Sequence, residues 1–175
     1  ATPPCRIIPG DTAGSYFTQD TRSFAVFGTA TLNLTDRWSV TGGLRYSHDT
    51  KDAYIDHYAL PGASAVLLRT QGPNHIGEVS RDESKVTWSA NTRFRWTDDI
   101  MTFATVATGF KAGGFNTRRV DAGTPYEFEP EESITYEAGI KTTLLDRRLM
   151  LNATVFNMLL KDFQESVLNP VTGTG

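Results

Sequence analysis

Long stretches of this chain alternate between apolar and polar residues with a period of two, and this alternation constrains the fold more than any other feature. Successive side chains of a β-strand point to opposite faces of the sheet, whereas a helix would place the same residues on both faces. The clearest stretch covers residues 85–96. Its even positions are largely apolar and include Val86, Trp88, Ala90, Phe94 and Trp96, and its odd positions are polar, from Lys85 to Arg95. The pattern predicts an all-β protein.

The alternation predicts about six strands in an antiparallel up-and-down meander. The expected strands cover about 21–34, 38–48, 85–96, 100–110, 133–144 and 149–163. Three of the links between them have the size of tight hairpin turns, whereas the links at about 49–84 and 111–132 are long and rich in turn-forming residues. Short and long links therefore lie at opposite ends of the meander. The whole chain, 1–175, is expected to form one domain.

Two architectures share this alternation. In a soluble sandwich the apolar face is an internal core, whereas in a membrane barrel it faces lipid and the polar face lines the lumen. The alternating stretches reach about 9 to 14 residues, which suits a tilted crossing of the membrane. Trp38 and Trp96 adjoin short turns while Tyr46 and Phe110 approach long loops, as two aromatic girdles would. Charges in mid-strand also favour the barrel, because a water-filled lumen tolerates them.

Six strands are too few to close such a barrel. With a spacing of about 4.8 Å and a tilt of about 40°, they would enclose a diameter of roughly 12 Å, which leaves no room for arginine side chains. Known transmembrane barrels have at least about eight strands. We therefore expect the chain to be a section of a larger barrel from a longer parent protein.

Three segments carry a family resemblance: FAVFGTATLNLTDRWSVTGGLRYSHDTKD (24–52), ATVATGFKAGGFN (104–116) and FEPEESITYEAGIKTTLLDRRLMLNATVFNMLLKDFQ (128–164). In this order and spacing they resemble the barrel of TonB-dependent outer-membrane receptors. The resemblance implies a transmembrane β-barrel of about 22 strands with a plugged lumen. Because no plug domain, coupling box or final strand ending in an aromatic residue is found, the chain is expected to be a middle portion of that barrel.

The resemblance also implies a function. Such a receptor imports a scarce ligand, such as a ferric siderophore, across the bacterial outer membrane. Its partners would be outer-membrane lipid, the ligand and the TonB energy-coupling complex, the last acting through segments outside this chain. Short turns would face the periplasm and long loops the exterior. Neither an enzymatic activity nor a cofactor is expected.

The candidate ligand-binding residues are polar side chains expected in the lumen or at the start of a long loop. A lumen lined by arginine raises the local concentration of anionic ligands, although these arginines could instead pair with Glu137 or with a plug. The glycines of the segment GFKAGGFN permit a sharp bend where a strand meets a loop. The candidates are Arg45, Arg93, Arg95, Lys111 and Asn116.

Other chemistry has weaker support. His48 and His57, with neighbouring aspartates, could coordinate a transition metal, but their spacing matches no defined site, so a solvated acidic loop is favoured. One cysteine, Cys5, excludes an internal disulfide, and no hydrolase motif is present. A net charge of −3, from 17 Lys and Arg against 20 Asp and Glu, does not suggest nucleic-acid binding.

Two other functions remain open at this level: a soluble all-β module that binds a ligand or carbohydrate, and a passive porin. The module requires a true core. If Val86, Trp88, Ile140 and Leu151 packed together inside a compact body, the membrane interpretation would fail.

Overall fold

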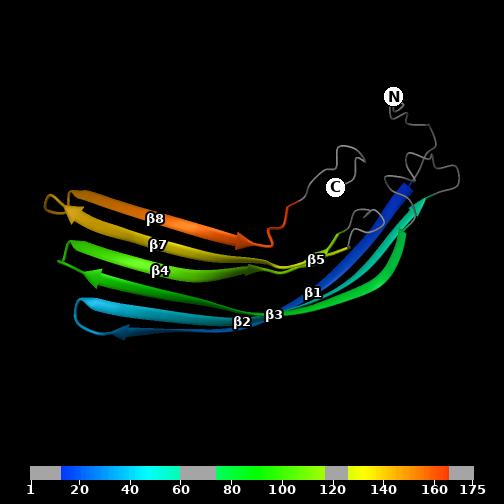
Figure 1. Ribbon diagram of the computed structural model, residues 1–175, viewed down its shortest axis with the longest axis horizontal. Helices are drawn as coiled ribbons and strands as arrows, with labels where there is room; N and C mark the ends of the chain where they lie inside the picture. Colours follow the sequence, from blue (N-terminus) through cyan, green and yellow to red (C-terminus); the bar gives the residue numbers. More distant parts are fainter. Residues whose placement is uncertain (1–12, 60–73, 117–125, 166–175) are drawn as a thin grey trace, which may run out of the picture.

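The computed structural model describes residues 13–59, 74–116 and 126–165. Six long strands form one antiparallel sheet in the order β1-β2-β3-β4-β7-β8, and β5 and β6 form a separate pair (Figure 1). The meander of about six strands is thereby confirmed. Among the described residues there is no helix with the length and hydropathy needed to span a membrane. The strands are β1 (Ala13–Asn33), β2 (Trp38–Ala59), β3 (Asn74–Arg95), β4 (Ile100–Lys111), β5 (Gly114–Phe115), β6 (Glu127–Phe128), β7 (Glu131–Leu144) and β8 (Leu149–Lys161).

The short turns lie together at one end of the sheet, which we name the turn end (Figure 1, left). In the β1–β2 turn, the hydroxyl of Thr35 accepts hydrogen bonds from the backbone N–H groups of Arg37 at 3.2 Å and Trp38 at 3.0 Å. The turns are also joined to the neighbouring strands, because the N–H of Arg95 donates to the carbonyl of Arg37 at 2.8 Å. Backbone hydrogen bonds therefore link the turns to the neighbouring strands at the turn end.

The apolar face of the sheet is not a core. Val86 is 55% exposed, Trp88 41%, Ile140 38% and Leu151 53%. A closed body with an internal core would have buried these side chains. Their exposure excludes the soluble module with its core on this face, and it leaves a sheet whose apolar surface requires a non-aqueous environment.

Aromatic side chains border this apolar face at both ends. The indole N–H of Trp38 donates to Oγ1 of Thr92 at 2.8 Å, and that of Trp96 donates to Oγ1 of Thr102 at 3.0 Å. At the other border of the apolar face, toward the long loops, the hydroxyl of Tyr46 on β2 donates to Oγ of Ser84 at 3.1 Å. Each ring thus has a polar group that is satisfied locally while its apolar body stays exposed, as in interfacial girdles.

The first three strands are longer than the sequence predicts. A loop was expected over 49–84, but β2 continues to Ala59 and β3 begins at Asn74, so only 60–73 lies outside the described residues. The prediction was wrong because charges occur on both faces of these extensions, which hides the alternation. The register shifts between Ile55 and Asp56, opposite Gly77, whose φ of 82° suits a β-bulge.

The other expected loop, 111–132, contains β5 and β6, with 117–125 outside the described residues. Pairing of β3 with β4 ends at Ser89 and Ala107. Just beyond, the hydroxyl of Thr108 accepts from the N–H of Trp88 at 2.8 Å and donates to its carbonyl at 3.2 Å. From this point β3 continues without β4 as a ladder partner. The chain after β4 enters the short β5–β6 sheet at the end opposite the turns, which we name the loop end.

Candidate functional site

The polar face of the sheet carries cations that lie against aromatic rings. The guanidinium carbon of Arg45 lies 5.8 Å from the ring centroid of Phe27, and Nζ of Lys141 lies 5.5 Å from that of Phe103. Arg45 also donates from Nε to Ser47 at 3.0 Å. Cation–π contacts of this kind hold a charge against the wall without neutralising it. The polar face therefore presents fixed positive charges.

The three predicted arginines lie at two separate places on the polar face and do not form one site. Arg93 and Arg95 lie on the same face of β3, and Arg93 donates from Nε to Ser39 at 3.3 Å. Arg45 lies opposite Thr87, six residues along β3 from Arg93. At about 3.4 Å per residue this separation is roughly 20 Å. The turn-end pair and Arg45 could contact one ligand only in succession.

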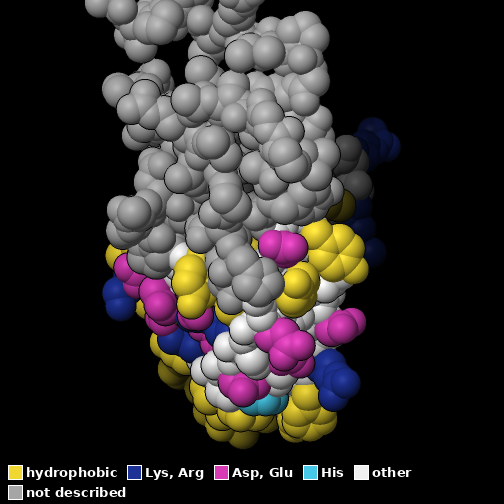
Figure 2. Space-filling model, turned by 90° about the vertical axis from the view of Figure 1, so that its right-hand side faces the viewer, with side chains coloured by type: hydrophobic (Ala, Val, Ile, Leu, Met, Phe, Trp, Pro, Cys, Tyr) yellow, Lys and Arg dark blue, Asp and Glu magenta, His cyan; other side chains and the backbone are white. Residues whose placement is uncertain are grey.

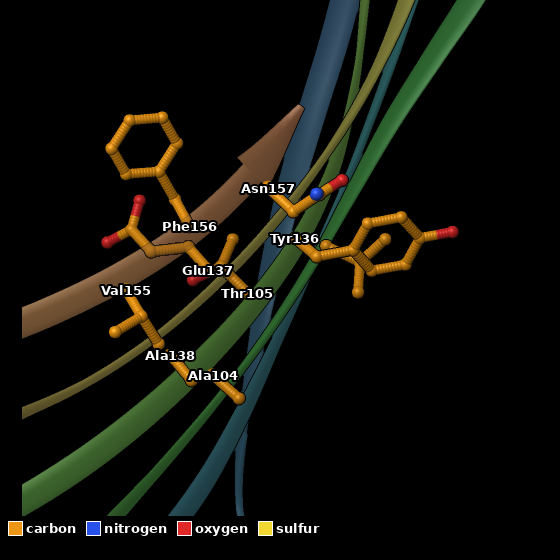
Figure 3. A pocket seen from close by; sticks show the side chains of 9 residues that line it. Ala104, Thr105, Tyr136, Glu137, Ala138, Val155, Phe156 and Asn157 are labelled. Atoms are coloured by element: carbon orange, nitrogen blue, oxygen red, sulfur yellow. The ribbon is translucent and has the colours of Figure 1, made fainter. Parts of the chain in front are cut away.

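Glu137 is not the ion-pair partner of these arginines. It lies opposite Thr105 on β4 and Phe156 on β8, and Figure 3 shows its carboxylate near the Phe156 ring. These residues border a shallow depression of about 420 Å³. Its lining is mostly apolar and contains one carboxylate and no cation, so it offers no anion site. The lining residues are Ala104, Thr105, Val106, Tyr136, Glu137, Ala138, Val155, Phe156 and Asn157.

A second cluster lies at the loop end, around Arg81 of β3. Its guanidinium contacts Glu127 at 3.3 Å and Glu129 at 3.0 Å, and it lies 3.6 Å from Glu83. Nζ of Lys51 donates to the carbonyl of Gly113. We name these groups the clasp: Lys51, Arg81, Glu83, Gly113, Glu127 and Glu129.

The clasp holds Arg81 in its charged form. Burial of the guanidinium opposes its charge, but the hydrogen bond and charge of Glu129, together with those of Glu83, outweigh burial and raise the pKa of Arg81 above its ordinary value. Acidic and basic side chains gather at the described part of this end (Figure 2). Three carboxylates surround one arginine, so the clasp itself is not an anion-binding site.

The two loop candidates lie beside the clasp. Lys111 ends β4 opposite Glu131, and its side chain is exposed. Asn116 is half-buried, and its N–H donates to the carbonyl of Tyr126 at 2.7 Å, which extends the β5–β6 sheet. Asn116 thus belongs to an ordered element rather than to a free loop.

Sequence reasoning missed the clasp, although a signal was present. Odd-numbered residues of β2 and β3 lie on the polar face, as Arg45 and Arg93 do. Lys51, Arg81 and Glu83 are also odd-numbered, so the polar face continues past the expected ends of the strands. Ala53 and Ile55 lie on this same face but are apolar. An apolar patch on an otherwise polar face indicates that another segment covers it.

The histidine candidates do not assemble a metal site. His48 faces the apolar side of the sheet, where Nδ1 lies 2.9 Å from the hydroxyl of Ser84 and Nε2 lies 3.4 Å from that of Thr50. The side chain of His57 lies outside the described residues. Among the side chains that the structure describes, no group of three or more His, Cys, Asp or Glu could hold a metal ion.

A curved antiparallel sheet with an exposed apolar face, aromatic borders and a cationic opposite face is the wall of a transmembrane β-barrel. Residues 3–175 match the family model described as TonB dependent receptor-like, beta-barrel. The chain belongs to this family, which confirms the resemblance noted in the sequence. Receptors of this family are outer-membrane barrels of bacteria, which gives the chain its location, and the family is not one of enzymes.

The curated relatives are receptors of greater length. The chain is 28% identical over 158 residues to the pesticin receptor of Yersinia pestis, covering 90% of this chain and 21% of that protein. It is 24% identical over 167 residues to the catecholate siderophore receptor Fiu of Escherichia coli K12, covering 88% of this chain and 22% of that protein. The chain thus spans about a fifth of the length of these relatives.

A solved structure has the same fold. The ferric yersiniabactin uptake receptor FyuA of Yersinia pestis superposes with a TM-score of 0.73 at 25% identity, over 87% of this chain and 22% of that chain. The siderophore receptor PiuA of Acinetobacter baumannii gives a TM-score of 0.58 at 22% identity, over 80% of this chain and 19% of that chain. The described sheet therefore corresponds to part of a receptor barrel.

Proposed function

We propose that this chain is part of the wall of a receptor that imports a ferric siderophore or a similar scarce ligand across the outer membrane. The family match over residues 3–175 carries the proposal. The names of the similar proteins support the ligand class, because they include a ferric yersiniabactin uptake receptor and a catecholate siderophore receptor. Coupling to TonB would act through segments outside this chain.

The charges of the polar face suit this ligand class. Ferric complexes with catecholate or carboxylate ligands are commonly anionic, and fixed cations along a lumen attract such ligands. We propose that Arg93, Arg95 and Arg45 guide the ligand along the wall. Lys111 and Asn116 would contribute at the loop end, which we place on the outside of the cell.

The test of import uses the full-length parent gene in a strain that lacks its own receptors. Uptake of a radiolabelled ferric siderophore is measured with and without a protonophore that dissipates the proton gradient. Uptake that depends on the gene and collapses with the protonophore supports the proposal. Uptake that continues without the gradient would favour a passive porin instead, and absence of uptake with a panel of ferric complexes would contradict the ligand class.

A further inference from the structure

The small β5–β6 sheet packs onto the polar face of the loop-end extensions of β2 and β3. Ile55 of β2 is completely buried, and Ala53 and Phe115 are each 6% exposed. Val79 of β3 packs against this group. In the described part of the chain, these are the hydrophobic side chains that form a dry cluster. Phe115 therefore anchors a segment that lies on the lumen side of the wall.

Polar contacts fix the same segment at its bend. The carbonyl of Gly113 accepts from Lys51, and its N–H donates to Oε2 of Glu83 at 2.9 Å. Arg81 reaches across to Glu127 and Glu129, at the two ends of the stretch that contains β6. The clasp therefore joins both strands of the small sheet to the wall.

Gly113 is required by this packing. A Cβ atom at this position would lie 2.4 Å from the carbonyl oxygen of Phe128 and 3.0 Å from Cζ and Nε of Arg81. Backbone cannot move away cheaply, so a side chain here would separate the bend from β6 and from the guanidinium. The bend and Arg81 fit each other only because residue 113 has no side chain.

The far side of the segment is tied to the chain that follows β8. Nε2 of Gln164 donates to the carbonyls of Ala112 at 3.2 Å and Glu129 at 2.9 Å. The N–H of Gln164 donates to Oε2 of Glu131 at 3.0 Å. The segment thus bridges two parts of the sheet, β2–β3 on one side and the end of β8 on the other.

We propose that residues 112–116 and 126–129 form a strap that is docked on the inner wall of the resting receptor and is held there by the clasp, with Arg81 as its central cation. Packed β layers lie about 10 Å apart, so the docked strap narrows the mouth of the barrel by about that amount on this side. The docking stands on the contacts above. Only its consequence, that the strap limits which ligands reach the lumen, rests on the proposed import function.

The test measures protection of the wall beneath the strap in the purified full-length receptor in detergent, with Cys5 and any other native cysteine replaced by serine. Ala53→Cys places a thiol in the dry cluster with little change of volume. Thr18→Cys places one on an exposed position of β1 as a reference. The readout is the rate of reaction with a bulky, polar maleimide, which requires neither ligand nor TonB.

We expect the Ala53→Cys thiol to react far more slowly than the Thr18→Cys thiol. Arg81→Gln should raise the rate at residue 53 by about tenfold or more, because removing the cation leaves three carboxylates repelling one another. Arg22→Gln, which removes an exposed arginine of β1 outside the clasp, should leave the rate unchanged. The milder Glu129→Gln should give a smaller increase.

Folding is checked separately by the heat-dependent electrophoretic mobility of the barrel and by an unchanged rate at Thr18→Cys. If Arg81→Gln does not fold, the labelling rate of the Ala53→Cys thiol is measured in Glu129→Gln and in Gly113→Ala, where an increased rate supports the proposal and an unchanged rate contradicts it. Rapid labelling of Ala53→Cys in the otherwise unaltered receptor would overturn the proposal, and so would full protection in folded Arg81→Gln. A docked strap in a receptor that fails the uptake assay would leave this inference standing and remove only the proposed function.

Discussion

The ring of Phe103 lies directly over Gly139 on the neighbouring strand. A Cβ atom at residue 139 would lie 2.7 Å from two atoms of that ring and 2.8 Å from the carbonyl oxygen of Ala153. Lys141 then places its ammonium group over the same ring. The absence of a side chain at Gly139 therefore lets one aromatic ring cover the strand and support a cation in the lumen.

This relationship predicts that Gly139→Ala destabilises the barrel, because both the ring and a backbone carbonyl would have to move. We expect a loss of about 1 to 3 kcal/mol in the free energy of unfolding of the full-length receptor, measured by urea titration after refolding in detergent. Gly42→Ala is the matched control, since nothing lies within 4 Å of a Cβ there. Alanine at Gly42 should be neutral or slightly stabilising. Equal effects at the two sites would contradict the packing described.

The hydrogen bond between Trp38 and Thr92 should show energetic coupling. Trp38→Phe and Thr92→Val each remove it, so the double variant should lose less stability than the sum of the single variants. A coupling energy of about 0.5 to 1.5 kcal/mol is expected from the same unfolding measurement. The pair Trp38 and Thr102 has no such contact and serves as the uncoupled reference. Simple additivity for Trp38 and Thr92 would show that the bond contributes nothing to stability.

The contact between Lys85 and Glu132 predicts a dependence on pH. Glu132 lies at the loop end of β7, outside the membrane-crossing segment. Its pKa is lowered by the hydrogen bond from Lys85 and by the charges of Lys85 and Lys161, with burial acting in the opposite direction. A lowered folded-state pKa means that the contribution is present above the ordinary glutamate pKa and is lost as the pH falls through the lowered value.

Because both side chains are partly exposed, this contribution is at most about 1 kcal/mol. We therefore expect Glu132→Gln to be less stable than the unaltered receptor at pH 7 and at pH 5, and the difference to vanish in strongly acidic solution. Unfolding midpoints measured from neutral to acidic pH test this expectation. A difference that stays constant over the whole range would exclude the ion pair as its source.

Lys111, which is exposed at the loop end, should affect the rate of ligand capture more than the stability of the barrel. Lys111→Gln should lower the association rate of an anionic ferric complex by about threefold at low salt, with a smaller effect at high salt. Arg37→Gln removes one positive charge from a turn at the opposite end of the sheet and is the matched control. Stopped-flow quenching of tryptophan fluorescence gives the rate. An effect independent of salt would point to a structural role.

Much of the fold could be predicted from the sequence because period-two alternation depends on few residues at a time. The runs around Trp38 and Trp88 therefore identified their strands and faces. The ends of β2 and β3 could not be predicted in the same way, since Asp49, Lys51 and Asp52 place charges on both faces once the strands leave the membrane.

The site was predicted less completely. The orientation of Arg45, Arg93 and Arg95 toward the polar face follows from parity and agrees with the structure. The clasp depends on contacts between residues far apart in sequence, such as Arg81 with Glu129 and Lys51 with Gly113, which no local pattern reveals. In the sequence, only the apolar residues Ala53 and Ile55, at positions of the polar face, indicate that another segment covers the wall there.

Strands β1 to β3 continue for more than ten residues beyond the level at which β3 stops pairing with β4. At the usual rise and tilt of barrel strands this part of the rim is taller by roughly 25 to 30 Å. An antibody or bacteriophage that approaches from the loop end would therefore contact the extensions of β1 to β3 before it reached the shorter strands. Surface epitopes and peptide tags should therefore be placed at the loop end of β1 to β3. The tight turns are unsuitable, because inserting one residue there would exchange the hydrocarbon-facing and water-facing side chains along a whole strand.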